Sequence, residues 1–199
     1  MPPTPFTSRP RWPLYEQSWP DGDYRLFQLG FVSEGDLVAD ALRWVEVFGV
    51  GPFHVLGPIE AACTHRGEAS GITIEVAVAQ AGPVQIELIA QRCARPSVFR
   101  EWRAHHAGAL HQLCTITSDY DSKRAQFERR GYEVATEILA PDGQRVAFVD
   151  TVDDFGFFTE IVDATPGFVG GLSAMARTCA EWDGVDPVRI VTREGYRTP

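Results

Sequence analysis

The sequence lacks the features that mark membrane, secreted and nucleic-acid-binding proteins. No apolar run approaches the roughly 20 residues that span a bilayer, and the first residues lack the charged-then-apolar order of a signal peptide. Basic residues form only short pairs such as Arg129-Arg130, and the net charge is -9, whereas phosphate-binding surfaces present clustered Lys and Arg. We therefore expect a cytoplasmic protein that binds neither membrane nor nucleic acid.

Closely spaced cysteine pairs are also missing. The chain has four cysteines and no CxxC motif, so neither a zinc knuckle nor a disulfide framework is indicated. The composition is otherwise that of an ordinary globular protein. Of the 199 residues, 44% are hydrophobic, which is enough for one substantial domain or two small ones.

Composition and periodicity divide the chain into five parts. Proline and aromatic residues dominate residues 1–22, which we expect to form an extended arm. Residues 92–108 are predicted to be a connector with a short helical turn. Its aromatic and histidine side chains, Phe99, Trp102, His105 and His106, either cover a hydrophobic substrate or fill the junction between the two repeats. We favour the junction. The other parts are residues 23–91, 109–164 and 165–199.

Two of these parts repeat one order of elements, a strand, a helix and three strands. Apolar periodicity predicts in residues 23–91 a strand at 24–33, a helix at 36–48, a short strand at 53–56, a loop at 59–70, and strands at 71–80 and 82–89. In residues 109–164 it predicts a strand at 110–117, a helix at 119–130, and strands at 132–139, 145–150 and 155–162. A helix at 167–181 and a polar tail follow.

Each repeat ends on an apolar strand that carries one carboxylate, Glu87 in the first and Glu160 in the second. Such a position is costly for a charge unless a partner is present. The two glutamates are either members of a shared site or partly solvated strand residues that bond nearby amides or Arg145.

Several short motifs recur in order along the chain. They are Phe27-Gln28-Leu29-Gly30-Phe31-Val32, Gly49-Val50-Gly51-Pro52-Phe53, Val84-Gln85-Ile86-Glu87-Leu88, Leu110-His111-Gln112 and Thr159-Glu160-Ile161-Val162. Their order and twofold repetition resemble the vicinal oxygen chelate superfamily, which includes glyoxalase I, methylmalonyl-CoA epimerase, extradiol dioxygenases and bleomycin-resistance proteins. The Gly49–Phe53 turn is similar to the glyoxalase and epimerase branch. The resemblance implies an α+β fold in which two β-α-β-β-β modules form a curved, mostly antiparallel sheet around one cleft, with a C-terminal helix after them.

The resemblance also implies a divalent metal held by one residue from the first and last strand of each module. The matching positions are Gln28 and Glu87, then Gln112 and Glu160. Epimerase-like members often have histidine where this chain has Gln112, and His111 comes one residue early. Because a one-residue shift turns a strand side chain to the opposite face, we favour Gln112 over His111 unless a bulge re-aims the histidine.

The metal type follows from the ligand chemistry. Carboxylate and amide oxygens suit hard cations such as Mg²⁺ or Mn²⁺ better than Zn²⁺ or Cu²⁺. In methylmalonyl-CoA epimerase a glutamate on a similar third-strand segment is the catalytic base, and Glu75 is the position that resembles it. We expect Ile72, Ile74 and Val76 to share one face, which leaves Glu75 facing the cleft; the alternative is an ordinary solvent-facing residue.

Two functional hypotheses from different classes remain. The first is a metal-assisted isomerase, epimerase or lyase that moves a proton on a small oxygenated carbonyl substrate through an enolate-like intermediate. The second is a non-catalytic protein that sequesters a small molecule without metal, as in the bleomycin-resistance branch. Either could form a homodimer. Metal retention distinguishes them.

Overall fold

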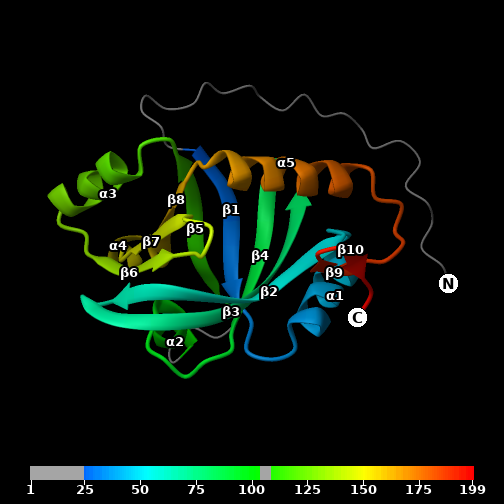
Figure 1. Ribbon diagram of the computed structural model, residues 1–199, viewed down its shortest axis with the longest axis horizontal. Coiled ribbons are helices and arrows are strands. Elements are labelled where there is room, and N and C mark those ends of the chain that lie inside the picture. Colours follow the sequence, from blue (N-terminus) through cyan, green and yellow to red (C-terminus); the bar gives the residue numbers. More distant parts are fainter. Residues whose placement is uncertain (1–24, 104–108) are drawn as a thin grey trace.

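The computed structural model describes residues 25–103 and 109–199 (Figure 1). The predicted arm at 1–22 and the histidines at 105 and 106 lie outside the described residues. The mixed α+β fold with a curved sheet is confirmed. No helix in the described ranges is long and apolar enough to cross a membrane.

The element order begins with a strand, a helix and three strands. These are β1 (Arg25–Val32), α1 (Leu37–Phe48), β2 (Phe53–His65), β3 (Glu68–Ala81) and β4 (Val84–Gln91). After α2 (Val98–Arg103) come β5 (Leu110–Thr117), α3 (Tyr120–Arg129), β6 (Val134–Leu139), β7 (Arg145–Val149), α4 (Val152–Phe155) and β8 (Phe158–Asp163). The last elements are α5 (Pro166–Ala180), β9 (Val188–Thr192) and β10 (Gly195–Arg197).

The strands form one sheet that closes on itself. Its order is β10-β9-β2-β3-β4-β1-β5-β8-β7-β6, and β2 also pairs with β6. At the centre β1 lies parallel to β4 and antiparallel to β5, while β5 lies parallel to β8. The first and last strands of the two halves are therefore neighbours, which brings Glu87 and Glu160 into one sheet region.

The sheet has an inner concave face and an outer convex face, each with its own apolar cluster. Leu37 of α1 and Cys179 of α5 pack with strand residues such as Leu88 on the convex face. On the concave face, Phe99 and Trp102 of α2 pack with strand side chains. The connector thus folds into the concave side, where its side chains take part in the core.

The predicted loop at 59–70 is wrong, because β2 and β3 form a long hairpin there. The Gly57-Pro58 pair predicts the end of a strand, but β2 continues through it with a register shift between Leu56 and Ile59. Beyond it, β2 pairs with both β3 and β6. Pairing on both sides satisfies the backbone of a segment whose side chains are mostly too polar or too small to reveal a strand.

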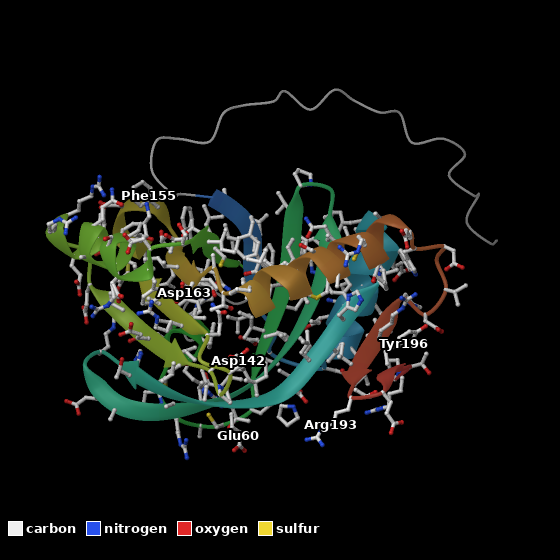
Figure 2. All side chains as sticks on the ribbon, turned by 45° about the horizontal axis from the view of Figure 1, so that its top comes forward. Glu60, Asp142, Phe155, Asp163, Arg193 and Tyr196 are labelled. Carbon is white, nitrogen blue, oxygen red and sulfur yellow. The ribbon has the colours of Figure 1, made fainter. Side chains whose placement is uncertain are left out.

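Two other predictions differ from the structure. The strand expected at 155–162 begins only at Phe158, because Val152–Phe155 forms the short helix α4. The polar tail contains β9, which adds to β2 in parallel, and β10. Figure 2 shows Arg193 and Tyr196 at this outer edge of the sheet. All three residues of β10 are exposed, so the sequence there shows no alternation of apolar and polar residues that would predict a strand.

Candidate functional site

Three of the four predicted metal ligands meet on the concave face. The Gln112 side-chain amide donates hydrogen bonds from Nε2 to Glu87 Oε2 at 3.1 Å and to Glu160 Oε2 at 3.3 Å. Gln112 and Glu160 are buried, and Glu87 keeps part of its surface exposed. We call these three residues the carboxyl site.

The register of the central strands explains this meeting. Gly30 of β1 pairs with Glu87 on one side and with Gln112 on the other. A Cβ at Gly30 would lie 2.1 Å from the Gln112 side-chain carbon Cδ. Only glycine leaves room for the amide to lie over the strand and reach both carboxyls.

The fourth predicted ligand, Gln28, bonds a different residue. Its Nε2 donates to Gln85 Oε1 at 2.7 Å, and both side chains are buried. Gln85 faces the same side of β4 as Glu87, two residues earlier, which the strand period indicated. Sequence reasoning assigned Gln85 no role, yet its Nε2 is buried with no hydrogen-bond partner among the described residues.

A bulge places His111 on the concave side together with Gln112. The step from Gly30 to Phe31 on β1 matches a step from Gln112 to Leu110 on β5, which leaves His111 as the extra residue. His111 Nδ1 lies against Gln112 Oε1 in a very short contact. This contact orients the amide so that its NH₂ group faces the two carboxyls.

His111 is enclosed by rings. It contacts the following aromatic side chains: Phe99, Trp102, Phe148 and Phe158. Burial is the main cause that lowers the pKa of His111 to about 4, against smaller raising effects of Gln112 and the Val98 backbone. The ring is therefore neutral at neutral pH.

The two carboxyls of the site hold protons more tightly than free glutamates. Burial, and then the charge of Glu160, raise the pKa of Glu87 well above its usual value, against the hydrogen bond from Gln112. Burial also raises the pKa of Glu160 to about 7. Adjacent buried carboxyls share protons as a pair, so the site can hold or release a proton near neutral pH.

Glu75 does not share a face with the carboxyl site, so the predicted orientation is wrong. On β3, Val78 pairs with Glu87 and Glu75 pairs with Ala90 in an unbroken register, which turns Glu75 to the opposite face. There its Oε2 accepts a hydrogen bond from Arg92 Nε at 2.6 Å. The sequence prediction failed because it assumed that the face with Ile74 and Val76 is the outer one.

The side chains of the carboxyl site can be compared with the ligands that a metal ion requires. Within residues 25–103 and 109–199 no group of three His, Cys, Asp or Glu side chains could hold an ion. The two carboxyl oxygens nevertheless converge on one atom, Gln112 Nε2. Both carboxyls accept a hydrogen bond from that NH₂ group, and rotation of the amide would present its oxygen instead. This donor set fits a hard divalent ion.

Comparison with known proteins places the chain among vicinal oxygen chelate proteins. The model of the glyoxalase/bleomycin resistance protein/dioxygenase superfamily matches residues 27–148, more than half of the 199-residue chain. No curated protein sequence matches the chain.

Similar solved structures include two epimerases. Methylmalonyl-CoA epimerase from Mycobacterium tuberculosis is 17% identical with a TM-score of 0.54, over 77% of this chain and 97% of that chain. A Streptomyces coelicolor methylmalonyl-CoA epimerase variant in complex with 2-nitronate-propionyl-CoA is 20% identical with a TM-score of 0.50, over 71% of this chain and 95% of that one. A hypothetical protein from Bacillus halodurans C-125 is 14% identical with a TM-score of 0.51, over 71% and 95%. At these identities the likeness concerns the fold.

Proposed function

Because this chain belongs to the glyoxalase/bleomycin resistance protein/dioxygenase superfamily, we propose that it is an isomerase, epimerase or lyase that moves a proton on a small oxygenated carbonyl compound. The observation that carries the proposal is the convergence of Glu87 and Glu160 on the Gln112 amide. One buried and one partly exposed carboxyl that share a partner on a concave face are an arrangement suited to proton transfer.

The two halves of the chain each contribute to this site. We take residues 23–91 and 109–164 as two β-α-β-β-β modules. The first supplies Glu87 and the second supplies Gln112 and Glu160. The shared strand pair β1 and β5 holds them in register.

Each residue of the carboxyl site has a distinct role in the proposed mechanism. Glu87, the more exposed carboxyl, takes the proton next to the substrate carbonyl and returns it. Glu160 is the more deeply buried second carboxyl, and Gln112 keeps the two carboxyls together through its hydrogen bonds to both. A divalent cation held by these three side chains would polarise the carbonyl oxygen.

Solvent-deuterium exchange tests the proton transfer. A panel of small ketones, 2-oxo acids and thioesters with an acidic α-hydrogen is incubated with protein in D₂O, and α-deuteration is followed by NMR. We expect Glu87→Gln to slow exchange by roughly 100-fold or more, the range typical of a lost general base. Exchange at the wild-type rate in Glu87→Gln would contradict the role of that carboxyl.

The assignment of Glu75 as base is decided in the same assay. Glu75 lies on the opposite face of β3 and pairs with Arg92, so we expect Glu75→Gln to keep the wild-type exchange rate. Loss of exchange in this variant, with Glu87→Gln still active, would restore the sequence-based assignment.

Metal assistance is measured separately by titrating Mn²⁺ and recording the signal of the free ion by electron paramagnetic resonance. We expect Gly30→Ala to weaken Mn²⁺ binding, because the added Cβ displaces Gln112. Gly35→Ala is the matched control, since a Cβ there meets no atom within 4 Å. If the wild type binds no Mn²⁺, the metal is removed from the mechanism while the exchange assay still tests proton transfer.

A further inference from the structure

A cavity of about 360 Å³ lies beneath α5, where this helix crosses the ends of several strands (Figure 1). It is lined by apolar and small polar side chains from β1, β3, β5 and α5, among them Phe27, Gln80, Ile116, Leu172 and Ala176. None of the described residues that line it is charged. Its volume is within the range of small-molecule sites.

Strand register places Gln80, which lines this cavity, on the concave face. Gln80 of β3 pairs with Gln85 of β4, and two steps along the same ladder Val78 pairs with Glu87. Directly paired residues point to the same face. Gln80 of the cavity wall and Glu87 are therefore on one face, at sheet positions that differ by one side-chain repeat of about 6.8 Å along the strand.

Along the central strand β1, the cavity, the carboxyl site and the aromatic side chains of α2 follow one another in that order. Its first residue pairs with Ile116, which lines the cavity, and Gly30 pairs with Gln112 of the carboxyl site. Its last residue, Val32, packs in the cluster that contains Phe99 and Trp102 of α2. The α2 side chains thus fill one end of the concave face, and the cavity beneath α5 lies at the other.

Between the cavity and the carboxyl site lies an unused hydrogen-bond donor. Gln85 is 1% exposed, its Oε1 accepts from Gln28, and its Nε2 has no partner among the described residues. A buried donor without a partner is energetically unfavourable. An oxygen atom of a ligand placed beside Gln85 would remove this cost.

We propose that the cavity beneath α5 binds the apolar body of an uncharged carbonyl compound whose oxygen accepts a hydrogen bond from Gln85. The inference rests on the proposed function in that the α-carbon of this compound would then lie toward Glu87. The absence of Lys and Arg from the described lining distinguishes the ligand from coenzyme A thioesters, whose phosphates require cationic partners. The substrate class is a neutral, largely apolar ketone or aldehyde.

Binding is tested with Prodan, a neutral naphthyl ketone whose emission shifts to the blue in an apolar site. We expect saturable binding to the full-length protein. Ala176→Trp fills the cavity and should weaken binding by roughly tenfold or more. Ala174→Trp, an exposed position on the same helix that does not line the cavity, is the matched control and should change it less than about twofold.

The hydrogen bond is tested by pairing a variant with a ligand change. Gln85→Leu should weaken Prodan binding by roughly threefold to tenfold, the effect of one lost hydrogen bond. It should leave unchanged the binding of the same fluorophore with its carbonyl reduced to a methylene group. Equal effects on both ligands would overturn the role of Gln85, whatever the effect of Ala176→Trp.

The outcomes separate this inference from the proposed function. No saturable Prodan binding, equal affinities of the Ala176→Trp and Ala174→Trp variants, or displacement of Prodan by micromolar coenzyme A would overturn the inference. Failure of Glu87→Gln to alter deuterium exchange overturns the proposed function instead. Prodan binding with the expected pattern then still establishes the cavity as a ligand site.

Discussion

At the scale of single residues, the chemistry of this protein depends on which side chains face the concave side. The repeat in the sequence predicted that Glu87 and Glu160 lie in one region, and their side chains do meet at Gln112, because β4 and β8 flank the adjacent strands β1 and β5. The orientation of Gln28 could not be predicted, since its partner Gln85 lies on a strand 57 positions away. His111 turned inward only through a bulge, and bulges have no reliable pattern in a single sequence.

The raised pKa of Glu160 predicts a pH-dependent stability. Burial raises the pKa of Glu160 to about 7 in the folded protein, from the ordinary 4.5 of a glutamate, so between these pH values the folded state holds a proton that the unfolded state has released. The contribution to stability is therefore present at low pH and is lost as the pH rises through about 7. In the presence of a chelator, Glu160→Gln should be more stable than wild type at pH 8 by roughly 1–3 kcal/mol.

The measurement is urea unfolding at pH 5 and pH 8. At pH 5 the two proteins should differ little, because the glutamine still offers an oxygen to Gln112. Glu75→Gln serves as a control carboxylate outside the concave face and should show no comparable gain at pH 8. Equal stabilities of wild type and Glu160→Gln at both pH values would show that this carboxyl carries no burial penalty.

At the scale of elements, α2 shows how a connector can become part of the core. Its start is fixed by Ser97, whose hydroxyl bonds Gln91 Oε1 at 2.5 Å. Glu101 of α2 contacts the β2–β3 hairpin through an ion pair with Arg66 and a 3.2 Å contact between its Oε1 and His65 Nε2. The sequence predicted a short helical turn with aromatic residues here, but which surface they cover depends on where the chain leaves β4.

Truncation of Phe99 tests the contribution of α2. This side chain is 1% exposed and contacts His111 and Phe148. We expect Phe99→Ala to lower the free energy of unfolding by about 3–5 kcal/mol, the cost of a large cavity. Phe99→Leu, which keeps most of the volume, should cost less than about 1.5 kcal/mol. Denaturant unfolding measures both, and a small loss for Phe99→Ala would place α2 outside the core.

The β2–β3 hairpin shows a different limit of sequence reasoning. The predicted helix at 36–48 agrees with α1 because its Asp36 cap and apolar spacing are local signals. The predicted loop at 59–70 failed because the strand there is held by pairing with β3 and with the distant β6. Local pattern specifies an element only where local interactions stabilise it.

At the scale of the whole molecule, the β2–β6 seam joins the two halves into one closed sheet. His65 Nδ1 and Thr136 Oγ1 are hydrogen-bonded at 2.8 Å across the seam, and both residues are buried. Because Glu87 comes from one half and Glu160 from the other, one chain supplies the complete carboxyl site. The possible homodimer stays a prediction, and the site does not require it.

Loss of the seam hydrogen bond should affect both halves equally. We expect Thr136→Val to destabilise the protein by about 1–2 kcal/mol, because it leaves one polar group of His65 without its partner. Native-state hydrogen exchange should show the same loss for amides of β4 and β8, since they belong to one cooperative sheet. Thr192→Val, at an exposed position on β9, is the control. A loss confined to β8 would show that the halves unfold independently.

The sequence by itself determined the class of fold, the twofold repetition of elements and the positions of the two strand glutamates. The order of elements and the strand glutamates depend on periodicity and on the cost of a charge in an apolar strand, both of which are local, whereas the curved sheet was implied by the family resemblance. Only the tertiary structure decided that Glu75 faces away, that Gln28 bonds Gln85, and that a cavity lies beneath α5. Each of these depends on register between strands far apart in the chain, where a shift of one residue reverses every side chain.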